Sequence, residues 1–160
     1  MRGQAAIEFL MTYGWAIFAL VLVLAALLSS GILSPNYLIS EECTFGNNIK
    51  CDFALFNEGG HSTLVLNVFN GFAYKVNITE IELTTQDGKI VTGFPGGVIL
   101  ESGENDTFSG TVSGPALPES TIKRFYGNIT YVSCAPELGP NCSTVQHTLS
   151  GRVVAKVIPQ

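Results

Sequence analysis

Charged side chains are scarce in this chain of 160 residues, where Asp, Glu, Lys and Arg together make up 13%. A typical soluble domain carries about 25%. The cations are the rarer sign, with eight Lys and Arg against thirteen Asp and Glu, and the formal net charge is −5. Because a nucleic-acid-binding surface needs a basic patch that neutralises phosphates, this composition disfavours nucleic acid as a partner.

Residues that carry chemistry are also sparse. The two histidines, His61 and His147, lie in alternating strand patterns, which is typical of packing residues. No HExxH, GxSxG or phosphate-binding loop is present, and no GxGxxG opens a helix. The carboxylates between Glu101 and Asp106 have the oxygen density that Ca²⁺ prefers but not a regular ligand spacing, which favours an acidic turn over a calcium site. We expect no enzyme activity, no cofactor and no bound metal.

One uncharged run stands out against this background. The twenty residues from Phe9 to Leu28 contain neither charge nor proline. As a helix rising about 1.5 Å per residue, the run is long enough to cross about 30 Å of hydrocarbon. Arg2 before the run favours a cytoplasmic N-terminus and an exported remainder, while Gly31 and Pro35 predict where the helix ends. An ionised group at the mouth of such a run, here Glu8, needs a partner.

The residues around Glu8 resemble a known signal. Arg2 and Gly3, followed by the string QAAIEFLMTYGWA from Gln4 to Ala16, are similar to the class III signal peptide of archaeal type IV pilins. The resemblance covers the chain only to about Ser30. It implies that a prepilin peptidase cuts between Gly3 and Gln4, which divides the chain into a leader (1–3), a hydrophobic helix (4–34) and an extracellular head (35–160).

The same resemblance implies a mode of assembly. The helix is held in the membrane first, and an ATPase with a membrane platform then adds it to a filament of identical subunits. The new α-amino group of Gln4, positive below a pKa of about 8, would pair with Glu8 of a neighbouring copy and set the register. The residues expected to pack in the filament core are Phe9, Leu10, Tyr13, Gly14, Trp15, Phe18 and Leu22.

Beyond residue 36 the pattern favours strands. Alternation with a period of two predicts strands over 61–70, 74–85, 122–134 and 145–157. A change of phase between Ile78 and Ile81 predicts a bulge or a change of sheet. Most aromatic residues, Phe69 among them, are in phase with these strands and expected in the core, whereas Tyr126 is expected outside. Short strands separated by Gly and Pro predict an antiparallel Ig-like sandwich, so the expected fold is α+β.

All four cysteines follow the apolar run, as Cys43 with Cys51 and Cys134 with Cys142, eight residues apart in each pair. An even number of cysteines after an N-terminal membrane segment indicates an oxidising exterior and disulfides. Three connectivities are possible, and the two local bridges are favoured because each pair brackets turn-forming residues. Four reduced cysteines are the alternative, whereas a zinc site would need closer spacing such as CxxC.

The Asn-x-Ser/Thr motif occurs four times, always in the part expected outside the cell. In the alternation pattern Asn77 and Asn128 fall opposite the apolar positions, and Asn105 and Asn141 fall in turn-rich stretches. All four sites are therefore candidates for glycosylation.

Together these observations favour a structural subunit of an archaeal type IV pilus-like filament that serves surface adhesion. The precursor is expected in the cell membrane and the mature chain in an extracellular filament. The alternatives are a membrane-anchored extracellular binding protein, a minor pilin and an archaellum-type subunit.

Overall fold

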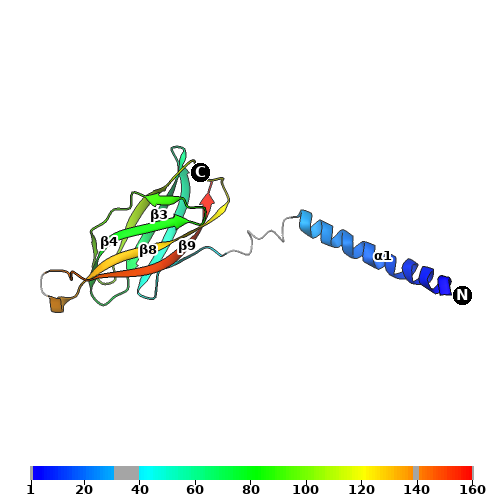
Figure 1. The fold of residues 1–160 in the computed structure, drawn as a ribbon, viewed down its shortest axis with the longest axis horizontal. Coiled ribbons are helices and arrows are strands. Elements are labelled where there is room, and N and C mark those ends of the chain that lie inside the picture. The colour runs from blue at the N-terminus through cyan, green and yellow to red at the C-terminus, as the bar shows by residue number, and fades with distance from the viewer. Residues whose placement is uncertain (1, 31–39, 139–140, 160) are drawn as a thin grey trace. The chain divides into compact units, whose positions relative to one another are not determined.

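The computed structural model describes residues 2–30, 40–138 and 141–159, except for the side chains of residues 2–6, 8–10, 12 and 138 (Figure 1). The chain separates into two compact units, Met1–Ser40 and Glu41–Gln160. The first contains the helix and the second contains all the described strands.

The first unit contains helix α1, Arg2–Ser29. The last turn is closed by Ser29 and Ser30, whose hydroxyls donate to the carbonyl oxygens of Ala26 and Leu27 at 3.0 and 2.9 Å. The predicted end of the helix near residue 34, with Gly31 and Pro35, lies outside the described residues. In the described part of the chain, no helix combines the length and the apolar character that crossing a membrane requires.

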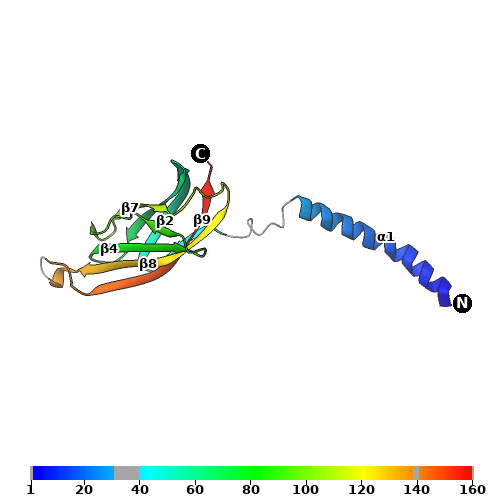
Figure 2. The same cartoon turned by 45° about the horizontal axis from the view of Figure 1, so that its top comes forward.

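The described residues of the second unit form nine strands. Figures 1 and 2 show this unit in two orientations. Their bounds are β1 Glu42–Thr44, β2 Ile49–Glu58, β3 His61–Asn70, β4 Lys75–Thr85, β5 Ile90–Thr92, β6 Val98–Leu100, β7 Asn105–Val112, β8 Ile122–Cys134 and β9 Gln146–Ile158. A short 3₁₀ helix, Pro136–Leu138, follows β8.

Seven of these strands close into a barrel. Pairing runs β4–β8–β9–β2–β3–β7–β5 and returns to β4. The closing contacts are short: β5 pairs two residues with each neighbour, and β2 meets β9 in parallel only at Leu55 with Val157 and Phe56 with Ile158. Strands β1 and β6 lie outside the ring and pair with β9 and β4.

The predicted α+β fold, a long hydrophobic N-terminal helix followed by an Ig-like sandwich, is wrong. The chain is mostly β, with 54% of its residues in strands and a seven-stranded closed barrel. Within α1, the longest stretch whose backbone and side chains are all described has 17 residues. Alternation identifies the buried face of a strand, and that face is the same in a sandwich and in a barrel. What separates the two folds is edge pairing, which here depends on the three-residue strand β5 and on two residue pairs between β2 and β9, all too short to show a period.

The strand predictions themselves hold. Strands β3 and β8 begin and end where the alternation placed them, and β9 covers the predicted last strand with a shift of one residue. The predicted irregularity in β4 is a bulge, because the register against β8 shifts between Ile78 and Glu80. The alternation therefore located the long strands correctly, although it did not reveal how they close.

The core of the barrel is apolar and fully enclosed. Its largest fully buried side chains include Phe45, Phe108 and Phe125, surrounded by Leu, Ile and Val from every long strand. The ring of Phe45 reaches β9 at Gly151, where an added Cβ would lie against that ring and against the carbonyl oxygen of Thr44. Glycine at this position allows the residues after β1 to close onto β9.

Two buried polar side chains fasten loops to the barrel. Asn70, which is 0% exposed, donates from Nδ2 to the carbonyl oxygens of Tyr74, Leu100 and Glu101, each at 3.0 Å, and its Oδ1 accepts the N–H of Phe72. These bonds hold the β3–β4 turn against the loop that precedes β7. The buried hydroxyl of Ser62 similarly accepts the N–H of Leu117 at 2.8 Å.

Candidate functional site

The most unusual surface of the chain is on α1. Of the eighteen large apolar side chains that are exposed among the described residues, thirteen belong to this helix. Five of them, Leu20 to Leu24, are consecutive and 46–60% exposed. Since a turn of helix takes about 3.6 residues, five consecutive positions surround the helix, and its apolar exposure is not limited to one face. We call these thirteen side chains the α1 apolar surface; they are Ile7, Met11, Tyr13, Trp15, Ile17, Phe18, Leu20, Val21, Leu22, Val23, Leu24, Leu27 and Leu28.

Several residues predicted to pack in a filament core belong to this surface. Trp15 is 73% exposed, and its ring centroid lies 5.8 Å from that of Phe18, while Leu22 is 54% exposed. Gly14 faces open space, because a Cβ added there would meet nothing within 4 Å. A partner helix approaching at this point would meet no side chain, which suits close backbone packing.

The predicted processing and register residues are placed only in part. Gly3, Gln4 and Glu8 belong to α1, and so do Phe9 and Leu10. The side chains of Gln4, Glu8, Phe9 and Leu10 lie outside the described part of the structure. The pairing of Glu8 with a neighbouring Gln4 amine therefore stays a prediction.

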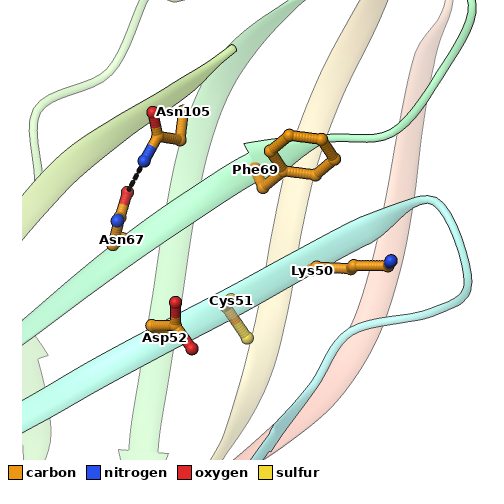
Figure 3. Close-up of a pocket in the computed structure, with 6 residues that line it drawn as sticks. All are labelled: Lys50, Cys51, Asp52, Asn67, Phe69 and Asn105. Carbon is orange, nitrogen blue, oxygen red and sulfur yellow. Dashed lines mark hydrogen bonds between the residues drawn. The ribbon is translucent and has the colours of Figure 1, made fainter. Parts of the chain in front are cut away.

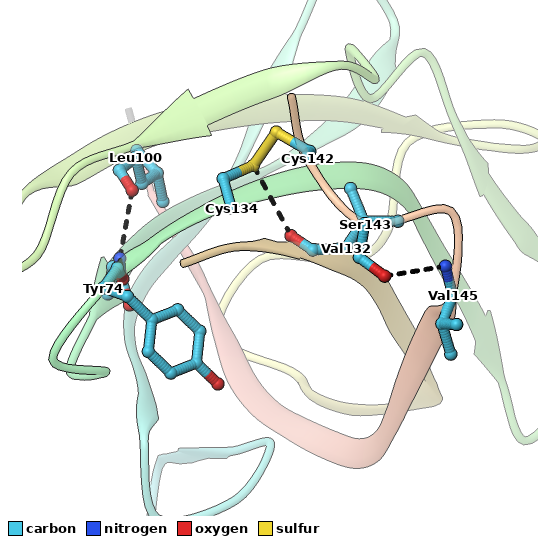
Figure 4. The surroundings of a disulfide bond; sticks show 8 residues. Tyr74, Leu100, Val132, Cys134, Cys142, Ser143 and Val145 are labelled. Atoms are coloured by element: carbon cyan, nitrogen blue, oxygen red, sulfur yellow. Dashed lines mark hydrogen bonds between the residues drawn. A yellow bond between two sulfur atoms is a disulfide. The ribbon is translucent and has the colours of Figure 1, made fainter. Parts of the chain in front are cut away.

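The cysteines form the two local disulfides. Cys43–Cys51 joins β1 to β2 with a Cα–Cα distance of 5.7 Å, and Cys134–Cys142 joins the end of β8 to the loop before β9 at 4.0 Å. Figure 4 shows the second bridge beside Ser143, whose Oγ accepts the N–H of Val145 at 3.0 Å. None of the described cysteines is free.

The four sequon asparagines differ in accessibility. Asn105 and Asn141 are exposed, and Asn105 is the first residue of β7 rather than part of a loop as predicted. Asn77 and Asn128 alternate with buried neighbours as predicted, but both are half-buried within the sheet. The Oδ1 atom of Asn77 is buried without a hydrogen-bond partner.

A shallow hollow of about 320 Å³ lies over the outward faces of β2, β3 and β7 (Figure 3). We call it the β2–β3–β7 hollow. Its Phe69 was expected in the core, yet it is half-buried and lines the hollow between the buried neighbours Val68 and Asn70. The signal was present in the sequence, because placing Leu64, Leu66 and Val68 inside puts Asn67 and Phe69 outside. The residues that line the hollow are Lys50, Cys51, Asp52, Asn67, Phe69 and Asn105.

His147 and the aromatic residues near the end of β8 form a row of ring contacts, whereas His61 lies elsewhere, at the start of β3. His147 is exposed and stacks on Tyr131 with 5.3 Å between ring centroids, and Tyr131 contacts Phe72 at the same distance. Burial is the main cause that raises the pKa of Tyr131, with a smaller contribution from the nearby Tyr74. His61 is exposed at the start of β3, with Nδ1 3.1 Å from the carbonyl oxygen of Gly114.

The acidic stretch forms a turn. A carboxylate oxygen of Glu104 accepts the N–H of Glu101 at 3.0 Å, so it stabilises the backbone before β7. In the described part of the chain, no three His, Cys, Asp or Glu side chains are grouped so that they can hold a metal ion.

Comparison of the sequence with protein-family models gives no match, and comparison with the sequences of curated proteins gives none either.

Proposed function

We propose that this chain is a structural subunit of an extracellular filament of the archaeal type IV pilus kind, and that the filament serves surface adhesion. The observation that carries the proposal is the α1 apolar surface, whose exposed side chains surround the helix. Soluble monomers rarely expose contiguous apolar patches larger than a few hundred Å². Copies of α1 packed side by side would cover this surface on every side.

The barrel also supports the proposal, through its enclosed core and its disulfides. Its core is complete, and its two disulfides suit an oxidising environment outside the cell. A domain of this kind tolerates exposure on the outside of a filament. In the proposal the precursor is at the cell membrane, and cleavage between Gly3 and Gln4 precedes assembly, as the resemblance of the first residues to archaeal pilins implies.

Burial of many apolar side chains would stabilise the filament. Burying one Leu, Ile, Val, Phe or Met side chain contributes about 1.5–3 kcal/mol. The described part of α1 offers thirteen exposed large apolar side chains, and polymerisation would bury them in every subunit along the filament. The proposed ion pair between Glu8 and the new amino group of Gln4 contributes register rather than bulk stability.

A matched pair of substitutions tests this assembly surface. Leu22 on α1 is 54% exposed and Ile90 on the barrel is 55% exposed, so Leu22→Ser and Ile90→Ser remove similar apolar area. Electron microscopy of expressing cells should show about thirtyfold fewer filaments for Leu22→Ser, given the loss of about 2 kcal/mol per contact. Ile90→Ser should assemble normally. Equal filament numbers in both variants would contradict assembly through α1.

A second candidate function is an extracellular binding protein that stays at the cell surface as single molecules, which the β2–β3–β7 hollow favours. The same electron microscopy separates the two candidates, because single surface molecules form no filaments. Loss of swimming on deletion of the chain would identify an archaellum-type subunit instead of an adhesive one.

The processing step has its own test. Gly3→Phe should block cleavage, leave the chain three residues longer and abolish filaments, while the control Arg2→Lys should be cleaved. N-terminal sequencing of the mature chain reads the outcome directly. A mature Gly3→Phe chain that still begins at Gln4 would refute cleavage at this position.

A further inference from the structure

The β2–β3–β7 hollow combines groups that suit a sugar. Phe69 offers a half-exposed aromatic ring, and Asn67 and Asn105 offer amide groups that both donate and accept hydrogen bonds. On the neighbouring strand β2, Lys50 lies across from Phe69 and adds a donor, and Asp52 lies across from Asn67 and adds an acceptor (Figure 3). A pyranose ring has the matching properties, with an apolar C–H face and a rim of hydroxyls. At about 320 Å³ the hollow is at the small end of ligand sites, which span roughly 300–1,000 Å³.

Asn105 places a sequon on the rim of this hollow. Asn105 begins the Asn-Asp-Thr motif, and both it and Thr107 are exposed on β7. The register makes Phe69 the direct cross-strand partner of Asn105, and Asn67 the partner of Thr107. The acceptor asparagine, the hydroxyl residue of its sequon and the aromatic ring thus share one face of the sheet.

The amide of Asn105 is already oriented. Its Nδ2 donates to Oδ1 of Asn67 at 3.0 Å (Figure 3). A glycosylated asparagine keeps one hydrogen on Nδ2, so the bond to Asn67 can remain while the other N–H position carries the sugar. The retained bond would fix the plane of the amide, and Phe69, the cross-strand partner of Asn105, is the adjacent ring on which the first sugar can pack.

The other three sequons lack this arrangement. Asn77 is half-buried between β6 and β8, and Asn128 is half-buried with Oδ1 accepting the hydroxyl of Ser150 at 2.7 Å. Asn141 is exposed, but it adjoins Cys142 of the second disulfide and lies outside the strands. None of the three is among the residues that line the hollow.

We propose that Asn105 carries a glycan and that the first sugar of this glycan packs on Phe69 in the β2–β3–β7 hollow. In the attachment step a bond forms between Nδ2 and C1 of the sugar, and the bond between C1 and the phosphate oxygen of a polyprenyl-phosphate-linked oligosaccharide breaks. Nδ2 gives up one proton to the solvent, and the polyprenyl phosphate leaves. The inference rests on the export of the chain that the proposed function requires.

Mass spectrometry of the full chain, purified from the cells that make it, tests the attachment. Peptides that contain Asn105 should carry hexose-type mass additions on most molecules, and Thr107→Ala should remove them although Asn105 is unchanged. An exported chain with both disulfides formed and an unmodified Asn105 would overturn this inference and leave the proposed function intact. A chain kept in the cytosol with free thiols would overturn the proposed function itself.

Thermal unfolding of the same purified chains tests the docking on Phe69. Asn105→Gln should lower the Tm both in the otherwise unchanged chain and in a chain that carries Phe69→Ala. The loss should be roughly 2–4 °C larger in the otherwise unchanged chain. Phe69→Leu, which keeps apolar volume without a flat ring, gives a second background in case Phe69→Ala folds poorly.

The matched control for this experiment is Phe56→Ala. Phe56 is also half-buried on the outward face of β2, but its partners are Thr63 and Ile158 and it does not line the hollow. Asn105→Gln should lower Tm in the Phe56→Ala background as much as it does in the unchanged chain. The same Tm loss in the Phe69 and Phe56 backgrounds would show that the sugar does not pack on Phe69 and would overturn that part of the proposal.

Discussion

Helix α1 and the barrel handle their apolar residues in opposite ways. The barrel encloses its large side chains, so that only five of those described are exposed, whereas α1 exposes thirteen. The barrel also holds its loops with buried hydrogen bonds, as Asn70 and Ser62 illustrate. The difference agrees with a barrel whose core is complete, and it underlies our proposal that α1 packs against an apolar partner. The following substitutions test this contrast, from the largest expected effect to the smallest.

Phe125→Ala should have the largest effect on the stability of the barrel. Phe125 is 0% exposed in the core, and truncation of a buried Phe costs about 3–5 kcal/mol. The matched change on the helix, Phe18→Ala at 53% exposure, should alter the unfolding of the barrel by less than about 0.5 kcal/mol. Urea denaturation followed by circular dichroism in the β region measures both. Equal losses would mean that the barrel depends on α1.

Asn70→Ala should come next, at about 3 kcal/mol, because it leaves the buried carbonyl of Leu100 and the part-buried carbonyls of Tyr74 and Glu101 without their donor. Asn67→Ala is the control, since the amide of Asn67 lies on the outward face and its loss should cost less than about 1 kcal/mol. Urea unfolding of the two variants compares them. If Asn67→Ala proved as costly as Asn70→Ala, the buried bonds of Asn70 would not be what holds the β3–β4 turn.

Removing one disulfide should cost slightly less. Both bridges span eight residues, and the chain-entropy relation gives about 2.5 kcal/mol for a loop of this size. We expect similar losses for the double variants Cys43→Ser with Cys51→Ser and Cys134→Ser with Cys142→Ser. Guanidinium unfolding under non-reducing conditions measures them. A much larger loss for one bridge would show that it stabilises through local packing instead.

The smallest effect should come from the surface ion pair of Lys123 and Asp87, whose charged atoms are 3.0 Å apart. The hydrogen bond from Lys123 lowers the pKa of Asp87 below its ordinary value of 3.8. A lowered folded pKa means that the pair contributes stability at neutral pH and loses it as the pH falls through 3.8 to the folded value. Asp87→Asn should therefore reduce the acid sensitivity of Tm slightly. An unchanged pH profile would show that the pair contributes nothing measurable.

The long strands could be predicted from the sequence, and their closure could not. The alternation of Leu64, Leu66 and Val68 defines β3 because burial on one face imposes a period of two. The barrel closes through β5 and through two residue pairs between β2 and β9. Such short pairings leave no periodic signal, so a sandwich and a barrel predict the same pattern.

The candidate sites, like the fold, could be predicted only in part from the sequence. The local disulfides were correctly favoured, because nearby cysteines that bracket a turn meet easily. The β2–β3–β7 hollow was missed because it depends on the register of the β2–β3 hairpin against β7, which lies far along the chain. Cross-strand pairing of Phe69 with both Lys50 and Asn105 becomes visible only once β2, β3 and β7 are aligned.

Trp15 gives the most direct measurement of the central claim that α1 is the assembly surface. It is the one tryptophan of the chain and is 73% exposed on α1, so intrinsic tryptophan fluorescence reports on this surface alone. In purified filaments its emission should shift to shorter wavelength, and quenching by acrylamide should fall about tenfold relative to the dispersed chain, because neighbouring helices cover the ring. Filaments in which Trp15 is quenched as readily as in the dispersed chain would contradict assembly through α1.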